Sequence, residues 1–188
     1  MCTAWDAKSV DVLETFGISA YKVASADLTN FPLLEHTAKK NKPMILSTGM
    51  ANLGEIESAL EILLLSGTDR ERIALLHCTT EYPAPLNEVN LKVIKTLRKS
   101  FGLKVGYSDH TLGTSVSIAA VALGAQIIEK HFTLSRNLSG PDQKLSIEPK
   151  ELKEMVAKIR LSEIMMGSGK IFPSKKEITA RNKFRRSI

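Results

Sequence analysis

Two short segments of the sequence carry residue types that bind metal ions and move protons. Residues 105–111 read VGYSDHT, and residues 128–133 read IEKHFT. Each segment begins with apolar character, as a buried strand does, and reaches a histidine that follows a carboxylate within two positions. Imidazole binds divalent transition metals, and a neighbouring carboxylate can accept or return a proton. The two segments therefore predict a site with metal or acid–base chemistry.

The alternation of side chains along a strand determines which of these groups share a face. Ser108 and His110 share one face of the first segment, and Glu129 and His131 share one face of the second, so the residue between each pair turns away. Residues 114–124 read TSVSIAAVALG, a helix-like stretch that ends at glycine. A strand, a helix and a second strand form parallel neighbours whose carboxyl ends meet at one edge of a sheet. Two imidazoles and a carboxylate are therefore expected to converge there.

The elements that position these groups follow from hydrophobic periodicity and helix-capping residues. Apolar runs typical of strands occur at residues 20–25, 43–48, 73–79, 104–107 and 126–132. Helical patterns with end signals occur at residues 6–16, 30–40, 54–65, 88–100, 114–124 and 149–166. This alternation predicts βα units in a parallel sheet, with polar residues after the strands at one edge. We therefore expect an α/β fold: a partial (β/α)8 TIM barrel with about five βα units and a leading helix.

Composition places the chain among globular proteins. It has 188 residues and 43% hydrophobic content, and no run approaches the roughly 18 apolar residues of a membrane span. The N-terminal residues MCTAWDAKSV lack the layout of a signal peptide, and two cysteines provide no disulfide framework. We therefore expect a cytoplasmic protein with no membrane partner.

The net positive charge arises at the end of the chain. The formal net charge is +6, and residues 170–188 hold seven lysines or arginines against one acid, Glu177. A basic segment that contains Pro173 and little apolar periodicity is typical of a solvated linker. A nucleic-acid-binding patch is the alternative, but only Phe172 and Phe184 in this segment offer aromatic rings for base stacking. We expect no nucleic-acid partner.

Six short motifs stand in order along most of the chain. They are KVAS at 22–25, LSTGM at 46–50, LHCTTEYP at 76–83, GYSDHT at 106–111, IEKHFT at 128–133 and GPD at 140–142. With these motifs the chain resembles the sialic acid synthase family, which comprises N-acetylneuraminate synthase and bacterial relatives that make legionaminic acid, pseudaminic acid or spore-coat polysaccharide sugars. Two positions depart from the family's pattern: Thr80 stands where asparagine or serine is frequent, and Gln143 where histidine is frequent. Both departures concern the identity of the sugar more than the class of reaction.

The resemblance implies a particular reaction. Members of the family condense phosphoenolpyruvate with an N-acetylated amino sugar, such as N-acetylmannosamine, to give a nine-carbon 2-keto sugar acid and phosphate. The chain is thus expected to be an N-acetylneuraminate synthase-like transferase that forms a C–C bond. Its expected cofactor is a divalent metal, Mn²⁺ in the first place, with Mg²⁺ or Co²⁺ as alternatives. The full-length form is expected to be a homodimer.

The resemblance also implies roles for individual residues. The positions that match the family's metal ligands are His110 and His131. The positions expected to hold phosphoenolpyruvate are Lys22, Ser25, Ser47 and Ser108. The positions expected at the sugar or the reacting centre are Thr80, Tyr82, Glu129 and Asp142. The expected catalytic residues among them are Lys22, Tyr82 and Glu129.

Elementary chemistry supports these roles and leaves simpler alternatives open. Lys22 lies in an otherwise uncharged strand and is costly to bury unless it meets an anion or extends along the barrel wall into water. Glu129 is close enough in sequence to the metal site to move a proton on the sugar aldehyde, or it orients His131. Both histidines could instead be core residues bonded to the backbone, and Tyr82 could shape the turn before Pro83.

Three further residues are expected to have structural roles. His77 lies inside an apolar strand, which favours a buried histidine without chemistry. Asp109 faces away from His110 and is expected to fix the loop that follows it. Cys78 is expected to be a packing residue.

We expect two parts in the chain. Residues 1–169 are predicted to form the partial TIM-barrel synthase domain, and residues 170–188 a basic linker toward a C-terminal antifreeze-like domain that this chain lacks. By the resemblance, Met1 falls near the family's third strand. The alternative function is therefore a non-catalytic fragment of such a synthase, which retains the metal and phosphate ligands but lacks the first barrel strands.

Overall fold

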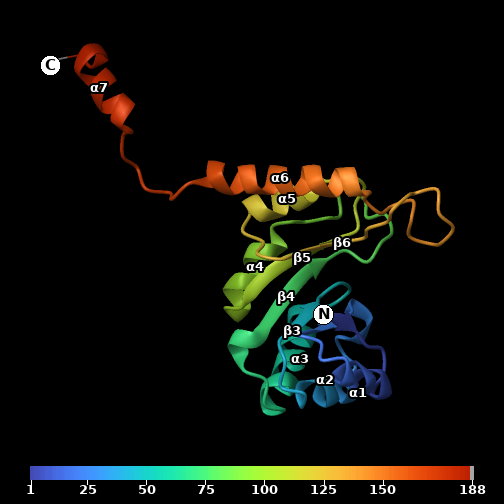
Figure 1. Cartoon of the computed structure of the whole chain (residues 1–188). Helices are drawn as coiled ribbons and strands as arrows, with labels where there is room; N and C mark the ends of the chain where they lie inside the picture. Colours follow the sequence, from blue (N-terminus) through green and yellow to red (C-terminus); the bar gives the residue numbers. More distant parts are fainter. Residues whose placement is uncertain (187–188) are drawn as a thin grey trace.

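A single parallel sheet organises the computed structural model, which describes residues 1–186 (Figure 1). Its six strands lie in chain order, and every neighbouring pair is parallel. They are β1 (Cys2–Thr3), β2 (Tyr21–Val23), β3 (Met44–Ser47), β4 (Ile73–Cys78), β5 (Lys104–Asp109) and β6 (Ile128–Lys130). A closed barrel of this kind has eight strands. The predicted α/β fold and partial barrel are therefore confirmed.

Helices cover the outer face of the sheet: five of them connect successive strands, and the sixth follows the last strand and packs against the fifth. They are α1 (Ala7–Thr15), α2 (Phe31–Ala38), α3 (Leu53–Leu65), α4 (Val93–Phe101), α5 (Ser115–Ala122) and α6 (Pro149–Met166). Helix α2 begins at the expected cap, where the Asn30 side chain accepts from the backbone N–H of Leu33. Helix α3 begins with a capping box between Asn52 and Glu55, which the sequence analysis did not use. Glycine ends α4, since Gly102 adopts the left-handed conformation with φ 64°.

Several elements differ from the sequence-based expectation. The two-residue β1 was not predicted, because a dipeptide shows no periodicity. The helix expected from residue 88 begins at Val93, since the preceding residues form turns with Asn90 at a φ of 41°. The strand expected at residues 126–132 shortens to β6, and the one expected at residues 104–107 continues to Asp109.

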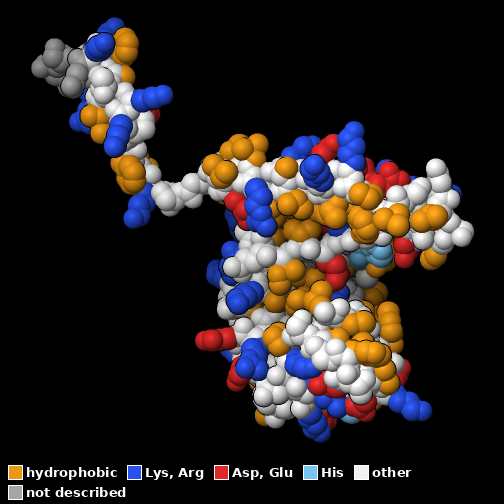
Figure 2. All heavy atoms as spheres, viewed as in Figure 1, with side chains coloured by type: hydrophobic (Ala, Val, Ile, Leu, Met, Phe, Trp, Pro, Cys, Tyr) orange, Lys and Arg blue, Asp and Glu red, His pale blue; other side chains and the backbone are white. Residues whose placement is uncertain are grey.

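The predicted basic linker contains a helix that the sequence analysis did not anticipate. Helix α7 (Lys175–Phe184) begins with a capping box between Ser174 and Glu177, a pattern the sequence analysis did not use. Its described side chains are mostly exposed, and Figure 2 shows basic side chains on this segment away from the body of the protein. Residues 187 and 188 of the predicted linker lie outside the described residues.

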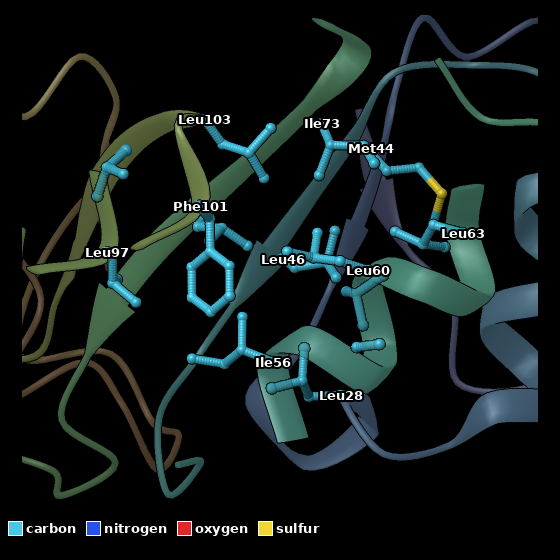
Figure 3. Packing of buried hydrophobic residues seen from close by; sticks show 14 of the residues in the cluster. Leu28, Met44, Leu46, Ile56, Leu60, Leu63, Ile73, Leu97, Phe101 and Leu103 are labelled. Atoms are coloured by element: carbon cyan, nitrogen blue, oxygen red, sulfur yellow. The ribbon is translucent and has the colours of Figure 1, made fainter. Parts of the chain in front are cut away.

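The hydrophobic core lies between the outer face of the sheet and the helices. Leu46, Leu75 and Val105, on three neighbouring strands, are fully buried in one cluster with Leu60 and Leu63 of α3. Figure 3 shows Leu46 packed toward Leu60. Burying each leucine contributes about 1.5–3 kcal/mol. This packing fixes the outer face, so the alternate residues of the same strands point to the inner face of the curled sheet.

No helix among residues 1–186 is long and apolar enough to span a membrane. Both cysteines are free, with Cys2 exposed and Cys78 buried.

Candidate functional site

Three polar side chains meet on the inner face of the sheet. Ser108 and Glu129 are register partners on β5 and β6, and the Ser108 hydroxyl donates to Glu129 Oε1 at 2.7 Å. Lys22 Nζ of β2 lies 3.0 Å from the same oxygen. The Lys22 side chain is 9% exposed and that of Glu129 is 35% exposed. The inner face therefore presents a buried cation, a hydroxyl and a partly accessible carboxylate in contact.

The two predicted metal ligands lie side by side just beyond the ends of β5 and β6. The ring centroids of His110 and His131 are 5.4 Å apart. His110 Nδ1 is 2.7 Å from the carbonyl oxygen of Thr79, so this nitrogen carries the proton and Nε2 keeps its lone pair. His131 Nδ1 lies 3.9 Å from Asp142 Oδ2. Burial lowers the pKa of His110, which favours the neutral imidazole.

Tyr82 covers both histidines. Its ring stacks on His110 with centroids 4.1 Å apart and meets His131 edge-on at 5.5 Å. The side chain remains about half exposed, and burial raises the pKa of its hydroxyl. Tyr82 therefore contacts the site directly, which goes beyond the alternative of a residue that only shapes a turn.

The histidine pair fits a metal site with few protein ligands. Within residues 1–186, no group of three or more histidine, cysteine, aspartate or glutamate side chains is arranged to hold an ion. Two imidazole nitrogens suit a six-coordinate divalent ion whose other ligands are water and substrate oxygens. His110 and His131 can therefore hold such an ion only in an open coordination sphere.

Hydroxyl groups line a cavity of about 160 Å³ next to the histidines. The predicted substrate-binding residues on its wall are Lys22, Ser25, Ser47, Thr80, Tyr82 and Ser108. A second cavity of about 240 Å³ shares Lys22, Tyr82 and Glu129 with the first and adds His131. Ser47 Oγ is buried without a hydrogen-bond partner among the described residues. Most of the predicted site residues therefore surround one connected space.

Asp142 stands at the margin of this site. Its carboxylate is half exposed on the segment between β6 and α6, and its contact with His131 is longer than a hydrogen bond. A larger cavity of about 540 Å³ lies between β6 and α6, and none of the predicted site residues line it.

Gly49 is a residue of the site that the sequence analysis did not single out. Its backbone N–H donates to Ser25 Oγ at 3.1 Å. A Cβ at this position would lie 2.8 Å from that oxygen and 3.1 Å from Thr80 Cγ2. The available signal was the glycine directly after the polar end of a strand, in LSTGM. Glycine is therefore required for the close approach of these two loops.

The three residues expected to be structural are all buried, and Cys78 also lines the smaller cavity. His77 is buried, with Nε2 2.7 Å from the carbonyl oxygen of Val89, and burial lowers its pKa. Cys78 is buried with Sγ 3.7 Å from His110 Nδ1, and burial raises the pKa of its thiol. Asp109 is fully buried on the outer face and accepts hydrogen bonds from the backbone N–H and hydroxyl of Thr111.

Comparison with known proteins gives consistent matches. The sequence model described as the NeuB family matches residues 1–171. The chain is 54% identical over 188 residues to N,N'-diacetyllegionaminic acid synthase of Campylobacter jejuni, covering 100% of this chain and 56% of that protein. It is 40% identical to N-acetylneuraminate-9-phosphate synthase of Homo sapiens over 164 residues, which is 87% of this chain and 45% of the human protein.

A solved structure matches the fold as well as the sequence. The N-acetylneuraminic acid synthetase from Leptospira borgpetersenii serovar Hardjo-bovis, in complex with citrate, superposes with a TM-score of 0.88 at 38% identity. The match covers 98% of this chain and 65% of that one. The chain spans about half the length of the curated relatives it matches.

Proposed function

The chain belongs to the NeuB family, and on that premise we propose that its protein condenses phosphoenolpyruvate with an N-acetylated amino sugar. In the proposed reaction, C3 of phosphoenolpyruvate forms a bond to the aldehyde carbon of the open-chain sugar. Water adds at C2, and the C2–O bond to the phosphate then breaks. A 2-keto sugar acid and phosphate are released. The relatives named as legionaminic acid and N-acetylneuraminate-9-phosphate synthases support this class of product.

The observation that carries the proposal is the contact of Lys22, Ser108 and Glu129 beside the two histidines. Phosphoenolpyruvate has a phosphate and a carboxylate, and a buried lysine with hydroxyl donors suits such an anion. We assign Lys22, Ser25, Ser47 and Ser108 to this substrate. The unpartnered hydroxyl of Ser47 supports the assignment, because a buried donor requires an acceptor.

The sugar is assigned to the side of the cavity that the histidines line. His110 and His131 would hold a divalent ion, Mn²⁺ by preference, which supplies Lewis-acid polarisation of the sugar aldehyde when bound. We assign to Glu129 the transfer of a proton: its carboxylate, which is partly accessible on the same face, accepts a proton from the water that adds at C2. Tyr82, Thr80 and Asp142 are assigned to contacts with the sugar.

A product assay tests this function. The protein is incubated with Mn²⁺, phosphoenolpyruvate and each of several N-acetylated amino sugars, and both the 2-keto acid and free phosphate are measured. We expect the two products in equal amounts and only when both substrates are present. Phosphate release that does not depend on the sugar would show a different reaction.

A further inference from the structure

A buried ion pair lies on the strands directly behind the two histidines. Asp109 and Lys130 are register partners on β5 and β6, and each immediately precedes a histidine in the sequence. Lys130 Nζ is 3.0 Å from Asp109 Oδ2, and the side chains are 3% and 0% exposed. By the alternation of a strand, the pair points away from the inner face on which Ser108 meets Glu129.

The hydrogen bonds of this pair converge on the residue that follows His110. Thr111 donates to Asp109 Oδ1 from its backbone N–H at 2.9 Å and from its hydroxyl at 2.7 Å. Lys130 Nζ donates to the carbonyl oxygen of Thr111 at 2.7 Å. The hydroxyl of Ser117 in α5 donates to Asp109 Oδ2. The pair therefore fixes the backbone on both sides of His110 and ties it to the residue that precedes His131.

Stability alone does not account for a buried pair of this kind. The desolvation of two buried charges offsets most of their attraction, and well-packed apolar residues in the same place are often as stable. Hydrogen bonds between ionised groups do, however, fix direction and distance closely. In a well-formed metal site, each metal–ligand distance lies within about 0.2 Å of its standard value. The pair can therefore hold the ends of the two strands in fixed positions. A metal site formed by His110 and His131 requires such fixed positions.

We propose that the Asp109–Lys130 pair is a positioning device that sets the spacing of His110 and His131 and thereby the affinity for a divalent cation. This inference rests on the proposed function, in which the two imidazoles bind that ion. The pair does not touch the ion. It acts by holding the ends of β5 and β6 in one register, so that the rings stay at their separation of 5.4 Å.

The test separates positioning from stability with two variants. Lys130→Met leaves the Asp109 carboxylate buried without its cation, so we expect a lower melting temperature and weaker Mn²⁺ binding. Asp109→Asn combined with Lys130→Met removes both charges, and the new amide oxygen can still accept from Thr111. We expect the double variant to regain most of the melting temperature but to bind Mn²⁺ at least about 10-fold more weakly than the wild type, as loss of outer contacts does at other metal sites.

Mn²⁺ alone is the probe, and its affinity is measured by calorimetry, with the absorption spectrum of bound Co²⁺ as a second readout of coordination geometry. Lys42→Met is the matched control, because it removes a Lys42–Glu14 pair of 2.8 Å elsewhere and should leave Mn²⁺ affinity unchanged. A double variant with wild-type Mn²⁺ affinity and Co²⁺ spectrum would overturn the inference. If the wild type binds no Mn²⁺, or His110→Ala binds it equally well, the metal site of the proposed function fails and this inference fails with it.

Discussion

Lys22 and Glu129 meet across the interior of the curled sheet, with Nζ 3.0 Å from Oε1, although three strands lie between β2 and β6. The contact requires the curvature of a barrel, since in a flat sheet neighbouring strands are about 4.8 Å apart and these residues would be far from each other. The fold therefore brings the proposed anion-binding lysine to the proposed proton carrier. This contact brings residues of distant strands together in one candidate site.

Replacing Lys22 with methionine should weaken binding of phosphoenolpyruvate selectively. The loss of one charge-assisted hydrogen bond is worth about 1.5–3 kcal/mol, which corresponds to roughly 10- to 150-fold in affinity. Calorimetry with phosphoenolpyruvate measures the change. The control is Lys39→Met, which removes an exposed lysine paired with Glu35 and should have no effect. Equal affinity in wild type and Lys22→Met would remove Lys22 from the substrate site.

Gly49→Ala should crowd the hydroxyl cradle, by which we mean the serine and threonine hydroxyls on the wall of the smaller cavity. The added Cβ would lie 2.8 Å from Ser25 Oγ, so the Ser25 side chain has to move away from its present position. We expect a lower melting temperature together with weaker binding of phosphoenolpyruvate. Ser25→Ala serves as the comparison, because it removes the hydroxyl without crowding and should weaken binding with little effect on melting. Unchanged binding in Gly49→Ala would show that the cradle does not hold this substrate.

His77 should make the stability of the protein depend on pH. Burial lowers its pKa from the ordinary value of 6.5, so below about pH 6.5 the unfolded chain binds more protons at this residue than the folded chain. The free energy of unfolding should therefore fall as the pH is lowered through that value. His77→Gln keeps a donor for the Val89 carbonyl and should reduce the fall between pH 8 and pH 5.5, as measured by urea unfolding. Identical pH profiles would contradict the assigned burial effect.

Residues 1–188 should self-associate when they are expressed. Among the described residues, β1 and β6 are each paired on one side only, and unpaired strand edges invite pairing with other chains. Light scattering gives the oligomeric state. A stable monomer at micromolar concentration would reject this prediction.

Much of the fold could be predicted because local signals determine it. The apolar runs of β2 to β5 and the cap at Asn30 depend on neighbouring residues alone, and the structure contains them. The dipeptide β1 and the late start of α4 could not be predicted in this way. The first depends on pairing with Tyr21 and Lys22, and the second on a turn at Asn90.

The sequence could assign candidate residues to the faces of the strands but could not predict their contacts. Alternation along the strands correctly turned Asp109 and Lys130 away from the histidines, but it gave no indication that they pair with each other. The approach of Lys22 to Glu129 depends on the curl of the whole sheet. The role of Gly49 depends on the distance between two loops 24 residues apart in sequence. Such relationships arise only from tertiary structure.

The most direct test of the account is anomalous diffraction at the manganese edge from crystals of the protein with Mn²⁺ and phosphoenolpyruvate. We predict one manganese peak within coordinating distance of a ring nitrogen of both His110 and His131. The phosphate and carboxylate of phosphoenolpyruvate should lie against Lys22, Ser25 and Ser47. A manganese peak away from the two histidines, or phosphoenolpyruvate bound outside this cavity, would contradict the account.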